Sequence, residues 1–182
     1  MSEDAPGRDT SPRFRGQPLL ITAQLPADLL AWADALRRAH YPPERNRLEA
    51  HVTLFHGLPP SAGAEVRQLL GTVATATAAP DARLTGIMDL GRGTAFAIDS
   101  PDMVRLHAQL AERLHGVIQQ KDTHELRLHV TVQNKVPRAE ALALQRDLSA
   151  SFRPRSFRFP AFGLYCWDGE LWIFAKRFAF RG

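Results

Sequence analysis

Two short strings of the sequence place a histidine and a threonine at the same spacing. Residues 51–54 read His-Val-Thr-Leu, and residues 129–132, in the second half of the chain, read His-Val-Thr-Val. Side chains at positions i and i+2 of a β-strand point to the same side. Each string therefore predicts a strand that buries one face and presents an imidazole and a hydroxyl on the other. By this alternation Phe55 and Gln133 are expected on the same faces as the histidines.

A pair of histidines presented in this way is suited to cleaving a phosphodiester with water. One proton must leave the nucleophile and another must reach the leaving oxygen, and histidine can do either because its unperturbed pKa is about 6.5. Each such transfer contributes typically about 10²–10⁴-fold. The pattern predicts His51 and His129 as the acid–base pair. Thr53 and Thr131 can then donate to the phosphate oxygens where charge accumulates, with no metal ion and no cofactor.

The hydrophobic pattern also predicts the elements that position these strings. Strands are expected over 19–23, 50–56, 83–89, 94–99, 126–134, 155–165 and 171–180, and helices over 27–39, 64–77, 101–117 and 137–149. Each half of the chain then contains a helix, a His-x-Thr strand, a second helix and a hairpin. We predict a duplicated α+β fold, in which two small antiparallel sheets face one another across a central groove with helices outside.

The domain organisation follows from composition along the chain. Residues 18–182 are expected to form a single bilobal domain, and residues 1–17 a disordered tail, because the tail lacks the apolar content to fold alone. Cys166 is the sole cysteine, which excludes an intramolecular disulfide and favours a reducing, cytoplasmic location. No run of about 18 apolar residues is present, so no membrane span is expected.

The net charge of +4 favours anionic ligands. Only three of the 23 basic residues are lysine, and arginine is the better bidentate partner for phosphate. A G+C-rich genome would produce the same arginine bias, so the composition alone does not identify the ligand.

With its two motifs in equivalent strands, the chain resembles the two-histidine (2H) phosphoesterase superfamily. It looks most like the branch of bacterial 2′-5′ RNA ligases and RNA 2′,3′-cyclic phosphodiesterases, over residues 18–180. The resemblance implies a pseudo-twofold fold with both motifs in one groove. It implies that His51 deprotonates the water and His129 protonates the leaving oxygen. RNA ends or small cyclic nucleotides are the implied substrates, and a site formed within one chain is consistent with a monomer.

Neighbouring residues extend the candidate site. Arg127 stands two residues before the second histidine and is a candidate phosphate ligand, although a charged strand end in solvent explains it equally well. Phe55, Tyr165 and Trp172 are candidates for stacking on a base, a contact worth about 1–3 kcal/mol per base in single-strand binders. Ordinary core packing is the competing interpretation of these aromatic residues.

Two other functions are compatible with parts of the pattern. A non-catalytic RNA-binding module could retain both motifs, but binding alone does not require two titratable imidazoles in symmetric places. A metallohydrolase could use some of the seven histidines, but the sequence has no His-x-x-x-His helix and no paired carboxylates. The double motif therefore favours an enzyme of the RNA 2′,3′-cyclic phosphodiesterase and 2′-5′ RNA ligase kind.

Overall fold

The structure is a computed structural model that describes residues 16–118 and 126–182. The predicted tail, residues 1–17, lies almost entirely outside the described residues. Within the described residues, the strands are β1 (Leu19–Ala23), β2 (Val52–Leu58), β3 (Asp81–Asp89), β4 (Gly93–Asp99), β5 (His129–Asn134), β6 (Arg155–Arg158), β7 (Ala161–Trp167) and β8 (Trp172–Ala179). The α-helices are α1 (Ala27–His40), α2 (Gly63–Thr75), α3 (Pro101–Arg113) and α4 (Arg138–Ser151), with short 3-10 turns η1 (Pro43–Arg45) and η2 (Pro60–Ala62).

The strands form two four-stranded sheets in which all neighbours are antiparallel. The first sheet has the order β2-β1-β7-β8 and the second has the order β5-β4-β3-β6. The two edge strands that carry the histidine motifs, β2 and β5, contact one another. The prediction of a duplicated α+β fold with two small antiparallel sheets is confirmed.

The two halves of the chain exchange their hairpins. The hairpin β3-β4 follows the first motif in sequence but pairs with β5 in the second sheet. The hairpin β7-β8 follows the second motif but pairs through β7 with β1 in the first sheet. Each sheet therefore combines two strands from one half with a hairpin from the other half.

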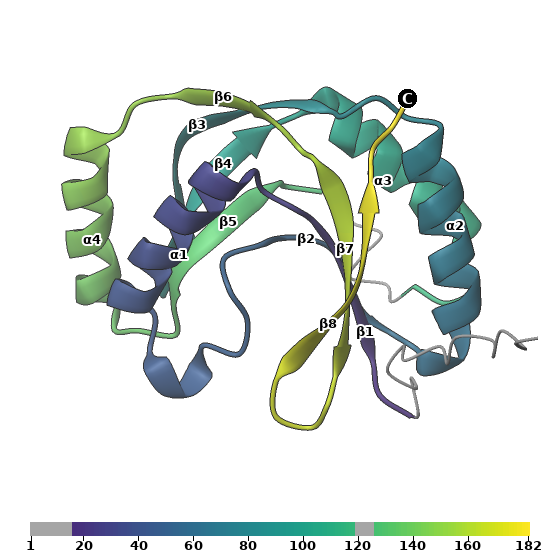
Figure 1. Cartoon of the computed structure of the whole chain (residues 1–182). Coiled ribbons are helices and arrows are strands. Elements are labelled where there is room, and N and C mark those ends of the chain that lie inside the picture. The colour runs from purple at the N-terminus through teal and green to yellow at the C-terminus, as the bar shows by residue number, and fades with distance from the viewer. Residues whose placement is uncertain (1–15, 119–125) are drawn as a thin grey trace, which may run out of the picture.

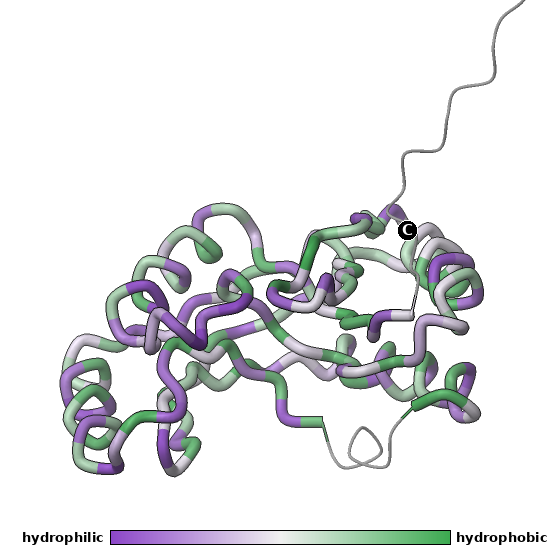
Figure 2. The backbone as a smooth tube through the Cα atoms, turned by 90° about the horizontal axis from the view of Figure 1, so that it is seen from below, coloured by the Kyte–Doolittle hydropathy of each residue, from purple (hydrophilic) through white to green (hydrophobic). Residues whose placement is uncertain are grey.

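The helices lie outside the sheets in two pairs, α1 with α4 and α2 with α3 (Figure 1). Trp32 of α1 packs on Phe96 of β4 with ring centroids 4.7 Å apart, so α1 covers the second sheet. His107 of α3 packs on Phe55 of β2, so α3 covers the first sheet. Along each helix the tube alternates between hydrophilic and hydrophobic residues, as expected for helices with one buried face (Figure 2).

One predicted strand is wrong as a single element. Residues 155–165 were expected to form one strand, but β6 ends at Arg158 and β7 begins at Ala161 in the other sheet. Pro160 lies at the break, and proline has no N–H to donate to a ladder. Phe159 is fully buried at this crossing and donates its backbone N–H to Pro80. The proline therefore marks the point where the chain passes from one sheet to the other.

Gly93 allows β4 and β5 to approach closely, which gives a test of this pairing. A Cβ at Gly93 would lie against the Gln133 carbonyl and only 2.7 Å from the Asn134 Cα, both backbone atoms. Gly93→Ala should therefore lower the free energy of unfolding by about 1–3 kcal/mol, as overpacking does. Gly86→Ala in β3 is the control, because a Cβ there meets no atom within 4 Å. Urea denaturation of both variants measures the difference, and equal stabilities would contradict the close approach.

Candidate active site

The first motif ends at a β-bulge in β2. Phe55 pairs with Ile21 and Thr53 pairs with Thr22, so Leu54 is an extra residue on this strand. An extra residue reverses the side to which the following side chains point. The expectation that Phe55 shares a face with the histidine is therefore wrong. Phe55 is 0% exposed and stacks on His107 at 4.4 Å between ring centroids, so it offers no free ring face to a base.

The second motif ends at an equivalent bulge in β5. Gln133 pairs with Thr94 and Thr131 pairs with Ala95, so Val132 is the extra residue. Gln133 is buried, and its side-chain oxygen accepts a hydrogen bond from the Thr94 hydroxyl at 3.2 Å. It was expected on the same face as the histidine and instead points into the protein. In both motifs the histidine is followed two residues later by the threonine. The bulge after the threonine then directs the next alternate side chain, Phe55 or Gln133, into the protein interior.

Both histidine rings are oriented by the same kind of hydrogen bond. Nδ1 of His51 lies 2.7 Å from the carbonyl oxygen of Glu49, and Nδ1 of His129 lies 2.6 Å from that of Arg127. A carbonyl oxygen can only accept, so Nδ1 carries the hydrogen in each ring. Nε2 of the neutral imidazole is then left without a hydrogen and is available to take up a proton. The duplication thus gives two rings that are anchored through Nδ1 in the same way.

The surroundings of His51 hold it in the neutral form. Desolvation of the half-buried ring is the main cause that lowers the pKa of His51 to about 4; the hydrogen bond to Glu49 opposes it, and the charges of Arg37 and His129 act in the same direction as desolvation. The influence of His129 on this pKa places the two motif histidines in one electrostatic environment. A histidine with this pKa is uncharged at neutral pH, as a general base must be.

Arg37 connects the two motifs, and sequence reasoning missed it. It is 4% exposed and donates from Nε to the carbonyl oxygen of Leu48 at 3.0 Å, in the loop that leads to the first motif. It also donates from Nη1 to the carbonyl oxygen of Thr131 at 2.9 Å, within the second motif. The signal in the sequence was an arginine in the buried stripe of α1, four residues after Ala33 and eight after Leu29.

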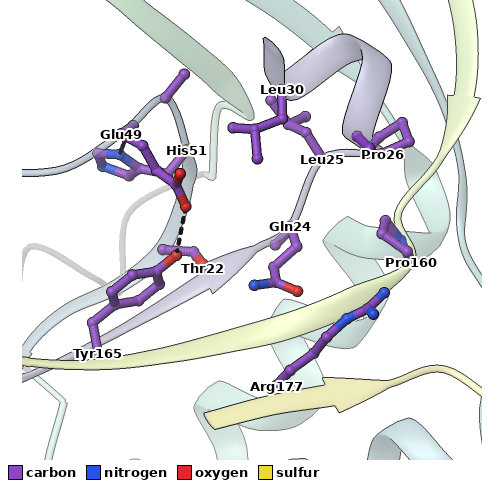
Figure 3. Close-up of a pocket in the computed structure, with 13 residues that line it drawn as sticks. Thr22, Gln24, Leu25, Pro26, Leu30, Glu49, His51, Pro160, Tyr165 and Arg177 are labelled. Atoms are coloured by element: carbon purple, nitrogen blue, oxygen red, sulfur yellow. Dashed lines mark hydrogen bonds between the residues drawn. The ribbon is translucent and has the colours of Figure 1, made fainter. Parts of the chain in front are cut away.

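A pocket of about 420 Å³ adjoins the first motif (Figure 3). His51, Glu49 and Tyr165 line one side of it, and Gln24 and Arg177 line the other. The remaining lining is largely apolar and includes Leu25, Pro26, Leu30 and Pro160. A pocket with an apolar lining and a few converging polar groups is the usual form of a small-molecule site.

Tyr165 contributes its hydroxyl to this pocket. The hydroxyl donates to Glu49 Oε1 at 3.4 Å, and the side chain as a whole is buried. Burial and the adjacent carboxylate of Glu49 raise the pKa of Tyr165 to about 12. The phenol therefore stays protonated and remains a hydrogen-bond donor at neutral pH. One edge of its ring packs against Phe174 at 5.4 Å between centroids.

The other candidate residues, including His129, are not among those that line this pocket. Thr53 is half-buried in β2 and Thr131 half-buried in β5, each two residues after its histidine. Arg127 is exposed just before β5. Trp172 packs against the rings of His56 and Trp167, and its backbone N–H donates to the Arg47 carbonyl. The structure thus groups Tyr165 with the first motif, but Trp172 does not line the pocket.

Comparison with known families identifies the group to which the chain belongs. A model of the 2′-5′ RNA ligase superfamily matches residues 25–171. The chain belongs to this superfamily. The resemblance carried by the two histidine motifs is thereby confirmed, and membership places the protein among enzymes of the RNA ligase and phosphodiesterase kind. No curated protein sequence matches the chain.

Solved structures of similar proteins show the same fold. TT0787 of Thermus thermophilus superposes with a TM-score of 0.62 at 18% identity, over 91% of this chain and 98% of that one. E. coli LigT in complex with NADP⁺ gives a TM-score of 0.56 at 19% identity, over 92% of this chain and 100% of LigT. LigT in complex with 3′-AMP gives 0.53 at 20% identity with the same coverage. At these identities the likeness establishes the fold of this superfamily member.

Removing the Arg37 guanidinium should destabilise the protein. Arg37→Met keeps most of the apolar stem but leaves the carbonyl oxygens of Leu48 and Thr131 without their donor. Hydrogen bonds to charged groups contribute about 1.5–3 kcal/mol, and the free energy of unfolding should fall by about that amount. The control is Arg38→Met, because Arg38 is exposed and its partner among the described residues is Asp34 on the same helix. Chemical denaturation should separate the two variants. An equal loss of unfolding free energy in both would show that the hydrogen bonds of Arg37 to the two motifs do not stabilise the protein.

The ionisation of His51 is directly measurable. In ¹⁵N-detected NMR, assigned by comparison with His51→Gln, its ring should titrate with a midpoint of about 4 because burial disfavours the charged form. Above that midpoint Nδ1 should carry the hydrogen, as its bond to the Glu49 carbonyl requires. The neutral ring is then lost only as the pH falls through about 4. A midpoint near the ordinary value of about 6.5 would show that the ring is not shielded from solvent.

Proposed function

We propose that this member of the 2′-5′ RNA ligase superfamily is a metal-independent phosphodiesterase that hydrolyses 2′,3′-cyclic phosphates at RNA ends or on nucleotides. One observation carries the proposal: two histidines lie at the beginning of equivalent bulged edge strands, and in both the ring is held through Nδ1 with Nε2 left for proton transfer. Membership of the superfamily supports the same class of chemistry.

The proposed mechanism assigns one proton transfer to each histidine. His51 is assigned as the base, as the family resemblance implies, and its lowered pKa leaves it neutral at the start of the reaction. It takes a proton from water as the water oxygen attacks phosphorus. The bond between phosphorus and O3′ breaks, His129 donates a proton to that oxygen, and the product carries a 2′-phosphomonoester. Thr53 and Thr131 donate to the non-bridging oxygens as negative charge accumulates on them.

The same geometry accommodates ligation. A ribose 5′-hydroxyl can take the place of water, lose its proton to His51 and attack the cyclic phosphate. The bond to O3′ breaks as before, and a 2′-5′ phosphodiester forms between two RNA ends. In both reactions, proton transfer and hydrogen bonds stabilise the negative charge that develops on the phosphate oxygens. Among residues 16–118 and 126–182 there is no group of three histidine, cysteine or acidic side chains placed to hold a metal ion.

Turnover of a 2′,3′-cyclic nucleotide in the presence of chelator tests the proposal. His51→Ala and His129→Ala should each lower kcat/KM by about a hundredfold or more, because each removes one proton transfer. The matched control is His115→Ala, which removes an exposed histidine near the end of α3.

Two outcomes would contradict the proposed function. Wild-type activity that needs a divalent metal and disappears in chelator would refute the mechanism. RNA binding that survives replacement of both motif histidines, with no turnover of a cyclic mononucleotide or of a cyclic RNA end, would instead establish a non-catalytic RNA-binding module.

A further inference from the structure

A second hollow, of about 430 Å³, lies between α2 and the edge strand β8. Four cationic side chains line it and no carboxylate does. The cationic residues are Arg67 on α2, Lys176 and Arg177 on β8, and Arg181 just after β8. Gln68, Thr72 and Thr75 add further polar groups to the same wall. We refer to this surface as the α2–β8 groove.

Seven arginines elsewhere in the described residues are paired with carboxylates. They are Arg38, Arg45, Arg47, Arg105, Arg138, Arg155 and Arg158. In the same part of the chain, Lys176, Arg177 and Arg181 make no ion pair with a carboxylate. The charges of Lys176, Arg177 and Arg181 are therefore not neutralised by a carboxylate of the described residues, and an external anion can pair with them.

Arg177 joins the α2–β8 groove to the pocket beside the first motif. It is exposed on β8, and it lines both the pocket that contains His51 and the α2–β8 groove. In the close-up its side chain extends from β8 toward Pro160 and Gln24, on the pocket side (Figure 3). Because β8 is the edge of the first sheet, no further strand separates the pocket from the groove.

We infer that the α2–β8 groove binds the sugar–phosphate backbone of single-stranded RNA whose cyclic end lies at His51. A groove that is lined by several cations and by no carboxylate suits a chain of regularly spaced phosphates, and such binding is strengthened by the release of counterions. A strand has further phosphates beyond the cyclic one at His51, whereas a 2′,3′-cyclic mononucleotide has none to place in the groove. The inference rests on the proposed function and narrows its substrate to RNA strands rather than mononucleotides.

Turnover of two substrates by matched variants tests the substrate class. The groove variant is Lys176→Gln with Arg181→Gln, and the control is Arg113→Gln with Arg146→Gln, which removes the same charge from exposed positions on α3 and α4. The substrates are a 2′,3′-cyclic mononucleotide and a single-stranded RNA of about 12 nucleotides with a 2′,3′-cyclic end, within the site sizes of single-strand binders. The ratio of kcat/KM for the RNA to that for the mononucleotide should fall about tenfold or more in the groove variant and stay within about twofold in the control.

Binding provides a readout that does not depend on catalysis. The probe is the same RNA ending in a 2′-phosphate, which contains no cyclic phosphate to hydrolyse, and its affinity is measured by fluorescence anisotropy between about 50 and 200 mM salt. Each phosphate contact to a single strand contributes about 0.7 to the slope of log K against log salt. Loss of two contacts should make the slope shallower by about 1.4 in the groove variant and leave it unchanged in the control.

The two measurements separate failure of this inference from failure of the proposed function. A wild type that turns over both substrates, with the same rate ratio and salt slope in the groove variant as in the control, would overturn the RNA groove while leaving the phosphodiesterase intact. A wild type that binds the RNA with the expected slopes but hydrolyses neither substrate would overturn the phosphodiesterase and retain the groove. An affinity for RNA that does not depend on salt would also overturn the groove.

Discussion

The arrangement of the site depends on one buried positive charge. Arg37 lies between the loop that leads to His51 and the strand that carries His129, where a guanidinium is tolerated only if protein oxygens replace its water. Leu48 and Thr131 supply backbone carbonyl oxygens, and Asn46 supplies a side-chain oxygen at 2.7 Å from Nε. These acceptors come from both halves of the molecule. All three hydrogen bonds of the guanidinium can therefore form only when the halves lie in this relative position.

The same charge also affects the chemistry of the site. Arg37 is close enough to His51 to disfavour a second positive charge there, and burial acts in the same direction. His51 is therefore kept as a neutral imidazole beside a permanent cation. The guanidinium itself donates to the oxygens of Asn46, Leu48 and Thr131, and its effect on the histidine is electrostatic.

Local features of the fold and site were predictable from the sequence, whereas features set by distant pairing were not. Residue patterns within a few positions predict the strand over 19–23 and the placement of both motifs on strands. They also predict the hairpin formed by the strands over 83–89 and 94–99. The bulges after Thr53 and Thr131 depend on register with neighbouring strands, which no alternation within β2 or β5 reveals. Phe55 and Gln133 were therefore assigned to the wrong faces. Arg37 and Pro160 did leave signals, one as a charge in an apolar stripe and the other as a proline inside a strand pattern.

The exchange of hairpins has a consequence for how the protein folds. The first sheet requires Leu19 to pair with Cys166, two residues from nearly opposite ends of the chain. Contacts of such long sequence separation form slowly, because the entropy of closing the intervening chain must be overcome before the pairing stabilises anything. During synthesis, β1 and β2 emerge long before the strand that completes their sheet. Both histidine motifs will therefore have left the ribosome before the first sheet can be completed.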